Sequence, residues 1–271
     1  MVTNNKKNVL LNFSRLGQVG RLGNQLFQVA FITQFAKRHS LKYGLPYWRY
    51  ADYFDYNFNF ADNVSDYNYD IILREPGLGY HESYFIKYVH QMQTLNANII
   101  TGYFQSYKYF EKTDILKIFK SNDKYNCPAI PQKSVAISVR RGDFVKHKDY
   151  LNIEASTFKE LLKNFKGYHV FVFTDDYKYC KNEFSGNNFE FMEGLTDIEQ
   201  ILTMCSFENF ILSNSTFSYW GPMLSKNPKT VFYPKFMFPD MNRCELYNRI
   251  YWPQNTSIYF PYLNPINKPF L

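Results

Sequence analysis

Two consecutive arginines, Arg140 and Arg141, directly follow a hydrophobic run and are themselves followed by Gly142 and Asp143. A guanidinium group stays charged at any working pH and presents a planar fork of N–H donors, so it can hold a diphosphate oxygen with two hydrogen bonds. The preceding run, Ser134 to Val139, alternates with the period of two that is typical of a β-strand. The sequence therefore predicts a phosphate-binding pair of cations at the carboxyl end of a strand.

Two other hydrophobic runs in the second half of the chain also end in polar residues. The run at 168–174 ends in a pair of aspartates, and the run at 209–212 ends in small hydroxyl and amide side chains. In order, these residues are Asp175, Asp176, Ser213, Asn214, Ser215 and Thr216. Ligands of open α/β sheets bind beyond the carboxyl ends of the strands. We therefore expect one site for a nucleoside diphosphate, with guanidinium and helix-end N–H groups on the phosphates and carboxylates on ribose hydroxyls or base N–H groups.

Each of these clusters also has a purely structural interpretation. The arginines and Asp143 could form a structural salt bridge, an aspartate pair after a strand often opens a helix, and a Ser/Asn/Thr run is an ordinary helix cap. The repetition of polar clusters on three strand ends favours a shared ligand site over three unrelated structural features.

The second half of the chain alternates strands with helices, which predicts an α/β fold with a mainly parallel sheet. The predicted strands are 135–140, 168–174, 188–192, 209–212 and 230–233, and the predicted helices are 157–165, 196–205 and a short one ending at 224. Thr157 with Glu160, and Thr196 with Glu199, fit capping boxes. Prolines at 127–131 suggest a linker, and the chain is predicted to comprise an N-terminal part at 1–127, a C-terminal part at 132–250 and a proline-rich extended tail at 251–271.

The first half begins with a predicted strand at 8–13, a loop with three glycines, and a helix at 25–38 with Asn24 as its N-cap. The glycine spacing differs from the dinucleotide fingerprint, but a strand, glycine loop and helix N-terminus in this order still predict an anion seat. Residues 99–110 are expected to form a strand and a loop that leads into a helix. No secondary structure is predicted for 47–79.

The composition narrows the classes of function. The chain has 271 residues, 45% hydrophobic and 20% aromatic, which is enough for a substantial core. Its net charge of +7 would suit nucleic acid, an anionic membrane surface, a phosphorylated substrate or simply a lysine-rich surface, and the scattered lysines argue against nucleic acid. Four cysteines without a CxxC pair and five histidines without ligand spacing indicate neither a disulfide framework nor a metal site.

No apolar run approaches the ~18 residues of a membrane span and no signal peptide core is evident, so we expect a cytoplasmic protein, with peripheral contact to an anionic membrane surface left open.

Five segments resemble, in order and approximate spacing, the motifs of the glycosyltransferase family 11 α-1,2-fucosyltransferases. They are GRLGNQLFQVAF at 20–31, GYFQSYKYF at 102–110, SVRRGD at 138–143, FTDD at 173–176 and NSTFSYWG at 214–221. The resemblance covers most of the chain, and NSTFSYWG together with RRGD is its most specific part.

This resemblance implies a GT-B-like fold of two Rossmann-type lobes, with an acceptor-side N-terminal lobe, a C-terminal lobe for the GDP-sugar, and the donor site at strand carboxyl ends in the cleft. It implies inverting transfer of L-fucose from GDP-fucose to the 2-hydroxyl of a terminal galactoside, in surface glycan or O-antigen synthesis. It also implies that the reaction needs no cofactor and no obligatory metal.

The resemblance assigns roles to individual residues. Arg140 is expected to grip the β-phosphate of GDP, with Arg141 supporting the loop or a phosphate. The other donor-site residues that it implies are Asn24, Gln25, Asp175, Asp176, Asn214, Ser215 and Thr216, and those on the acceptor side are Tyr103, Phe104, Gln105 and Ser106. Asp143 is a candidate catalytic base, with a water relay, Asp149 or Glu82 as alternatives.

The chain departs from the family pattern at Ser138, where the motif has histidine, and more mildly at Tyr219, where tryptophan is common. Because that histidine can contact guanine in related enzymes, we expect a base contact that is weaker or supplied by another residue. Two alternatives remain open, namely transfer with another linkage or another nucleotide sugar, and a non-catalytic glycan-binding module. A glycan-binding module would have no reason to bind GDP.

Overall fold

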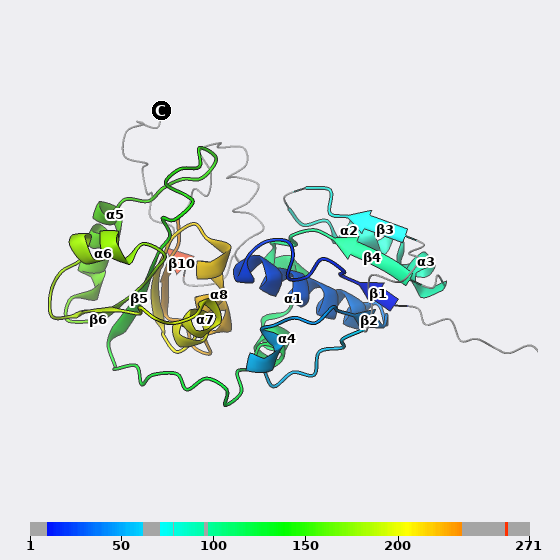
Figure 1. Ribbon diagram of the computed structural model, residues 1–271, viewed down its shortest axis with the longest axis horizontal. Coiled ribbons are helices and arrows are strands. Elements are labelled where there is room, and N and C mark those ends of the chain that lie inside the picture. Colours follow the sequence, from blue (N-terminus) through cyan, green and yellow to red (C-terminus); the bar gives the residue numbers. More distant parts are fainter. Residues whose placement is uncertain (1–9, 62–70, 78, 95–96, 235–257, 260–271) are drawn as a thin grey trace, which may run out of the picture. The chain divides into compact units, whose positions relative to one another are not determined.

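A computed structural model describes residues 10–61, 71–77, 79–94, 97–234 and 258–259. The chain divides into two compact units, residues 1–124 and residues 125–271, and each contains a parallel β-sheet (Figure 1). The division falls just before the predicted linker at 127–131. Most of the predicted tail, 251–257 and 260–271, lies outside the described residues.

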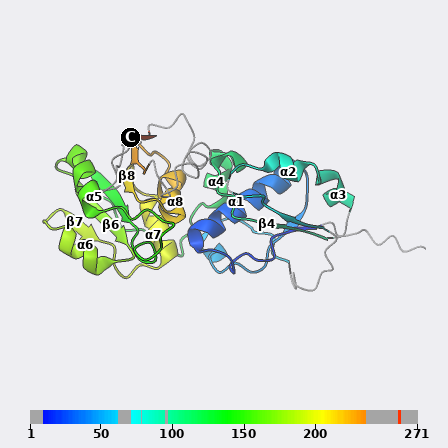
Figure 2. The same ribbon diagram turned by 90° about the horizontal axis from the view of Figure 1, so that it is seen from above.

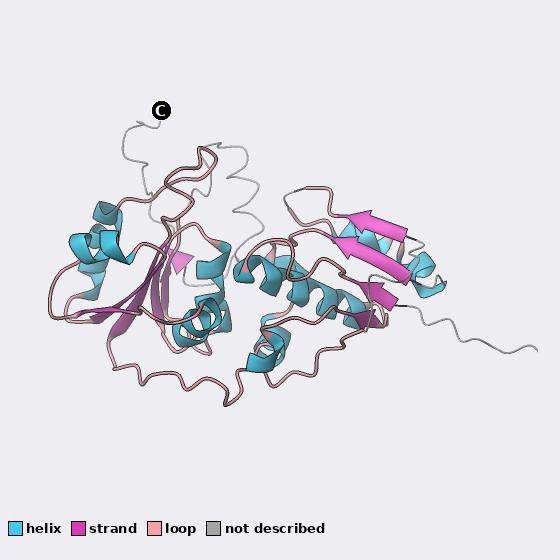
Figure 3. Ribbon diagram, viewed as in Figure 1, coloured by secondary structure: helices cyan, strands magenta, loops and turns pink. Residues whose placement is uncertain are grey.

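The first unit has a four-stranded parallel sheet with the order β2-β1-β4-β3 (Figure 3). Its strands are β1 (Leu10–Asn12), β2 (Tyr43–Gly44), β3 (Ile71–Arg74) and β4 (Ala97–Thr101). Its helices are α1 (Leu22–Arg38), α2 (Glu82–Ile86), α3 (Val89–Thr94) and α4 (Lys112–Ile118), with 3-10 turns η1 (Ala51–Tyr53) and η3 (Tyr107–Tyr109). Strand β3 and turn η1 come from the segment for which no secondary structure is predicted.

Helix α1 begins earlier than the sequence predicts. The backbone N–H groups of Asn24 and Gln25 already donate to the carbonyl of Arg21, so the helix starts at Leu22 with Arg21 as its N-cap. The expectation that Asn24 caps this helix is therefore wrong. The Asn24 side chain instead accepts a hydrogen bond of 2.9 Å from Gln105.

Aromatic side chains form much of the core of the first unit. Phe31 of α1 stacks on Phe104, in the loop after β4, with ring centroids 3.8 Å apart. Phe31 also contacts Phe85 of α2 and Tyr109 of η3. Because all four rings are buried, they fasten the loop after β4 to the helices on one side of the sheet.

The second unit has a six-stranded parallel sheet with the order β10-β9-β8-β5-β6-β7. Its strands are β5 (Ser134–Val139), β6 (His169–Thr174), β7 (Phe189–Phe191), β8 (Asn209–Leu212), β9 (Thr230–Phe232) and β10 (Ile258–Tyr259). Its helices are α5 (Ala155–Leu162), α6 (Tyr177–Glu183), α7 (Asp197–Met204) and α8 (Thr216–Leu224), with the 3-10 turn η4 (Lys163–Phe165). If β5 is counted as the first strand, this is the 3-2-1-4-5-6 order of the Rossmann fold.

The two faces of this sheet pack against different helices (Figures 1 and 2). Val135, Ile137 and Val139 of β5 lie in a hydrophobic cluster with residues of α5 and α6. Ser138, at an alternating position, contacts Ser218 of α8 instead. The chain therefore changes faces between β5 and β8, which makes the ends of these two strands the topological switch point of the sheet.

The two predicted capping boxes have different outcomes. At α7, Thr196 accepts a hydrogen bond from the backbone of Glu199, whose carboxylate accepts one from the backbone of Thr196, so this box is confirmed. The box predicted at Thr157 and Glu160 is wrong. Helix α5 begins at Ala155 after the N-cap Glu154, and the N–H of Thr157 is already bonded to the Glu154 carbonyl.

Candidate functional site

The three polar clusters predicted from the sequence follow three adjacent strands at the centre of the second sheet. Strand β5 pairs with β6 through Val139 opposite Thr174, and with β8 through Ser138 opposite Leu212. The residues after all three strands consequently lie along the same edge, on both sides of the switch point between β5 and β8. In sheets of this type, that is where ligands bind.

Arg140 lies between two carboxylates at this edge. Its guanidinium group pairs with Asp143 three residues later in the chain and with Asp175 after β6. The Arg140 side chain is 16% exposed and its guanidinium carbon lies 5.3 Å from the ring centre of Phe144. The arginine is therefore held in place from several directions. Its contacts with the two carboxylates each involve one terminal nitrogen, and a guanidinium group has five N–H donors, so further donors remain beyond these two ion pairs.

Asp175 connects the loop after β5 with the loop after β6. One carboxylate oxygen of Asp175 accepts hydrogen bonds from the backbone N–H groups of Arg141 at 2.8 Å and Gly142 at 3.1 Å. A Cβ atom at position 142 would lie 2.4 Å from the other oxygen, so only glycine allows this close approach. This contact fixes the backbone that carries Arg140.

Arg141 points toward helix α6 rather than along the edge. Its guanidinium carbon lies 3.4 Å from the centre of the Tyr179 ring, and its Nε lies 3.4 Å from Asp176. Asp176 is also the N-cap of α6, since its side chain accepts a hydrogen bond of 3.1 Å from the backbone of Tyr179. These contacts give Arg141 and Asp176 a structural role in joining the two loops.

Helix α8 begins directly after β8, at the same edge. Ser215 is its N-cap and accepts a hydrogen bond of 3.2 Å from the backbone of Phe217, and Thr216 is the first residue of the helix. Asn214 donates a hydrogen bond of 2.9 Å to the carbonyl of Leu151. The first backbone N–H groups of a helix and its dipole attract anions, so this end of α8 suits a phosphate group.

Ser138, where the family motif has histidine, is buried beneath this helix. Its hydroxyl group lies 2.7 Å from that of Ser218, which in turn lies 3.2 Å from that of Ser213. The three hydroxyl groups form a cluster between β5, β8 and α8. The serine therefore takes part in packing the sheet against the helix, and it is 5% exposed.

Of the two donor-site residues expected in the first unit, Gln25 is the more enclosed. It donates a hydrogen bond of 2.9 Å to the carbonyl of Gly20 and accepts one of 3.0 Å from the indole of Trp48. It is buried and holds the glycine loop onto the core. Asn24 lies in the first turn of α1, joined to Gln105 as described above.

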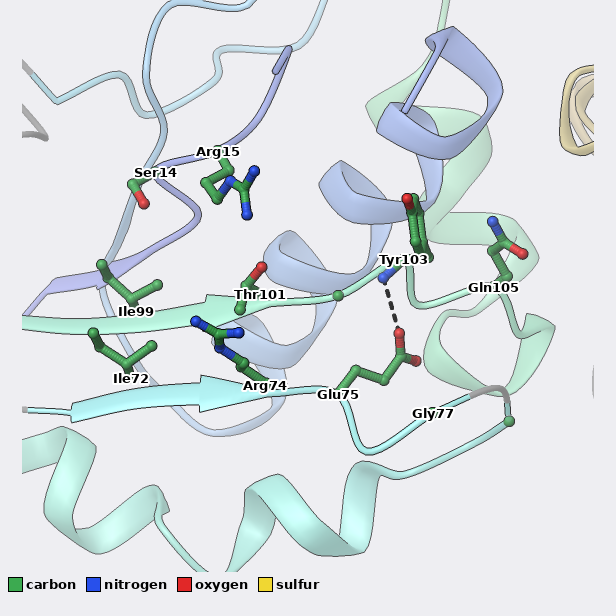
Figure 4. Close-up of a pocket in the computed structure, with 12 residues that line it drawn as sticks. Ser14, Arg15, Ile72, Arg74, Glu75, Gly77, Ile99, Thr101, Tyr103 and Gln105 are labelled. Carbon is green, nitrogen blue, oxygen red and sulfur yellow. Dashed lines mark hydrogen bonds between the residues drawn. The ribbon is translucent and has the colours of Figure 1, made fainter. Parts of the chain in front are cut away.

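The four residues expected on the acceptor side divide into two pairs. Tyr103 and Gln105 line a pocket of about 550 Å³ at the carboxyl ends of β3 and β4 (Figure 4). Phe104 and Ser106 are fully buried in the core, because successive side chains of the loop point in opposite directions. Phe104 has a φ of 52°, a left-handed conformation that is uncommon for a residue with a side chain.

Glu75 supports the unusual backbone at Phe104. One of its carboxylate oxygens accepts hydrogen bonds of 2.9 Å from the backbone N–H groups of both Tyr103 and Phe104, and the other accepts one of 3.3 Å from the Tyr109 hydroxyl. Burial raises the pKa of Glu75 above its ordinary value, although these three hydrogen bonds favour the charged form. Glu75 therefore positions the loop that carries Tyr103.

The candidate bases differ in how they are held. Asp143 pairs with Arg140, and Glu82 is buried against Arg38 and the hydroxyl of Tyr80. Burial and the neighbouring Glu82 raise the pKa of Tyr80 to about 12. Asp149 is exposed beside His147, at 3.9 Å. The ion pair of Glu82 with Arg38 gives it a structural role in the first unit.

The sequence did not point to three further residues that line the pocket of the first unit. These residues are Arg15, Arg74 and Glu75. The available signal was weak: Arg15 follows the first strand, and Arg74 and Glu75 end a short hydrophobic run inside the segment with no predicted structure.

Within the described ranges, no group of three or more His, Cys, Asp or Glu side chains could hold a metal ion. None of the helices described there has the length and apolar character needed to cross a membrane.

Comparison with known proteins agrees with this architecture. The sequence pattern of Glycosyl transferase family 11 matches residues 53–256, and the chain belongs to this family. An alpha-1,2-colitosyltransferase from Escherichia coli is 30% identical over 45% of this chain and 50% of its own length, so the chain spans about half of that curated relative. A crystal structure of NodZ alpha-1,6-fucosyltransferase soaked with GDP-fucose aligns with a TM-score of 0.51 at 10% identity, covering 79% of this chain and 92% of that one. The expected GT-B-like α/β fold is confirmed.

Proposed function

We propose that this family 11 glycosyltransferase moves L-fucose from GDP-fucose to the 2-hydroxyl of a terminal galactoside, with inversion at the anomeric carbon, in the synthesis of a surface glycan. The observation that carries the proposal is the convergence of the Arg140 loop, the aspartate pair and the start of α8 at the switch point of a Rossmann-order sheet. The E. coli relative is named for an α-1,2 linkage, which supports the choice of hydroxyl.

Arg140 has the central role in this proposal. As the bond between the fucose anomeric carbon and the diphosphate oxygen breaks, negative charge grows on the departing GDP. Cations and N–H groups that are already fixed in position stabilise such charge most effectively. Asp143 and Asp175 fix Arg140 while leaving donors for phosphate oxygens. The N–H groups at the start of α8 would contact the same diphosphate, with Ser215 and Thr216 beside them.

The acceptor 2-hydroxyl attacks the anomeric carbon from the face opposite GDP and gives its proton to a base. The contact of Asp143 with Arg140 supports a positioning role for this carboxylate. Asp149 or a water molecule then remains as the proton acceptor. No metal ion is required in this scheme, because Arg140 and the helix terminus carry the charge stabilisation.

The decisive experiment is incubation with GDP-fucose and a panel of galactosides, followed by NMR analysis of the linkage in the product. We expect GDP release and a fucose α-linked to the 2-hydroxyl of galactose. A product with another linkage would overturn the proposed regiochemistry. Calorimetric titration with GDP separates an enzyme from a glycan-binding module, since only the enzyme should bind GDP.

A second candidate donor is a colitosyl nucleotide, favoured by the name of the E. coli relative. The same acceptor panel should be offered with both donors. Faster transfer from the colitosyl donor than from GDP-fucose would favour this candidate and leave the proposed role of Arg140 unchanged.

A further inference from the structure

The pocket of the first unit lies on one face of its sheet. The role proposed for Arg140 and the start of α8 does not account for its lining residues. Cross-strand neighbours Ile72 with Ile99, and Arg74 with Thr101, contribute side chains from β3 and β4. Figure 4 shows these four side chains projecting from the same face of the strands, with Arg15 reaching over them from the loop after β1. The pocket has a volume of about 550 Å³, which is in the range of small-molecule sites.

Two unpaired cations line this pocket. Within the described residues, the guanidinium groups of Arg15 and Arg74 have no hydrogen-bond or ion-pair partner. In the same unit, Arg38 is paired with Glu82. Glu75 is the carboxylate nearest in sequence to Arg74, but it faces the backbone of Tyr103 and Phe104. Among the residues that the structure describes, Glu75 is the carboxylate that lines the pocket, and its oxygens are bonded to the loop at Tyr103 and Phe104 and to Tyr109 rather than to the two arginines.

The remaining walls suit a sugar ring. Ile72 is 59% exposed and Tyr103 is 43% exposed, so both side chains present apolar surface to a ligand in the pocket. Apolar and aromatic surfaces pack against the C–H faces of sugars, while Thr101 and Gln105 offer hydrogen-bonding groups beside them. An arginine fork binds a carboxylate or a phosphate group with two parallel hydrogen bonds. The pocket thus matches a saccharide that carries a negative charge.

We propose that the pocket formed by Arg15, Arg74, Ile72, Thr101, Tyr103 and Gln105 binds an anionic group of the acceptor, so that the preferred acceptor is an acidic or phosphorylated saccharide. This inference rests on the proposed transfer to a galactoside and specifies the class of acceptor. The two arginines bind the anion, and the apolar wall holds the adjoining sugar ring.

The test uses three acceptors with the same terminal galactose. The second residue is a neutral hexose in the first, a hexuronic acid in the second, and a hexose phosphate in the third. Binding is measured by calorimetry without donor, and transfer is measured with GDP-fucose. We expect at least one charged acceptor to bind about 10- to 100-fold more tightly than the neutral one, as two charge-assisted hydrogen bonds would allow. If the acceptor with the hexuronic acid binds more tightly, the pocket recognises a carboxylate; if the acceptor with the hexose phosphate binds more tightly, it recognises a phosphate group.

Arg15→Gln and Arg74→Gln should each remove most of this advantage while changing binding of the neutral acceptor less than about 2-fold. Lys87→Gln is the matched control, because Lys87 is an exposed cation of the same unit that does not line the pocket. Added salt should weaken only the charged acceptors. If the wild-type protein binds charged and neutral acceptors with equal affinity, this result alone overturns the inference, and the variants need not be measured.

The binding measurement separates this inference from the proposed function. Charge-dependent binding that Arg15→Gln abolishes, without transfer from GDP-fucose to any acceptor, would support the anion pocket and contradict the fucosyl transfer. Transfer to all three acceptors with equal KM would support the fucosyl transfer and contradict the anion pocket.

Discussion

The two sheets of this chain both place arginines at strand ends, but they hold them in opposite ways. In the second unit Arg140 and Arg141 contact carboxylates and aromatic rings. In the first unit Arg15 and Arg74 line a pocket without a partner among the described residues. An arginine that is fixed in advance suits charge that develops during a reaction, because no reorganisation is needed at that moment. An unpaired arginine suits an anion that is already charged when it binds, because no internal ion pair must first be broken.

The largest effect should come from the fixed arginine of the second unit. We expect Arg140→Ala to lower kcat/KM with GDP-fucose about 100- to 1,000-fold, the usual cost of removing one donor to a developing anion. Stability should change by less than about 1 kcal/mol, because the pairs that Arg140 makes are partly exposed. Steady-state kinetics and urea denaturation measure the two quantities. Near-normal turnover in the variant would contradict the role of Arg140. It would also contradict the distinction between a fixed arginine for developing charge in the second unit and unpaired arginines for a bound anion in the first.

The next effect concerns the loop that forms one wall of the pocket in the first unit. Glu75→Ala leaves the backbone N–H groups of Tyr103 and Phe104 without their acceptor, and we expect a loss of about 2 kcal/mol in the free energy of unfolding. Glu75→Gln keeps an acceptor oxygen and serves as the matched control, with a loss of less than about 1 kcal/mol. Equal losses for the two variants would show that the hydrogen bonds to the loop do not matter.

A smaller effect on stability is expected at Arg141. Arg141→Ala removes the stacking on Tyr179 and the contact with Asp176, and it should cost about 1 kcal/mol of stability. At a temperature where the variant is fully folded, its kcat/KM should fall less than 10-fold, which is far less than for Arg140→Ala. Thermal unfolding and kcat/KM, measured on both variants, separate the two arginines. If Arg141→Ala were as inactive as Arg140→Ala, Arg141 would be a ligand of the diphosphate rather than a loop support.

The smallest effect is a dependence of stability on pH. Burial raises the pKa of Glu75 in the folded state, so the folded protein binds this proton more tightly than the unfolded chain does. The stability that Glu75 contributes is therefore fully present below its ordinary pKa and is lost as the pH rises through the raised value. Relative to Glu75→Gln, which does not titrate, the wild type should become less stable between acidic and neutral pH. A constant difference in urea denaturation across this range would contradict the raised pKa.

The architecture of the second unit could be predicted from the sequence because its central strands are buried on both faces. Strands of this kind appear as continuous hydrophobic runs, and the residues that end them stand out as polar. The runs that become β5, β6 and β8 were therefore found, together with the clusters that follow them. The partners within the clusters were not predictable, since the contact of Arg140 with Asp175 depends on which strands are neighbours.

The first unit gave weaker signals for physical reasons. Strand β3 is short, and only Leu73 among its residues is buried, so its hydrophobic run is too brief to stand out as a buried strand. The cross-strand neighbours of Arg74 and Ile72 come from β4, more than twenty residues later, so no local pattern reveals the pocket. The error at Asn24 arose because asparagine is a common N-cap. Here the helix had already begun at Leu22.

The cluster of hydroxyl groups at Ser138, Ser213 and Ser218 has a consequence for how such enzymes diverge. A histidine at position 138 would need room that Ser218 now fills, and overfilling a packed interior costs about 1 to 3 kcal/mol. Ser218 itself belongs to the segment that resembles the family motif, so the mutation Ser138→His should require a small shift of helix α8 relative to β5 rather than a smaller residue at position 218. The packing between these two elements, whose serines lie 80 residues apart in the chain, thus limits which base contacts position 138 can regain.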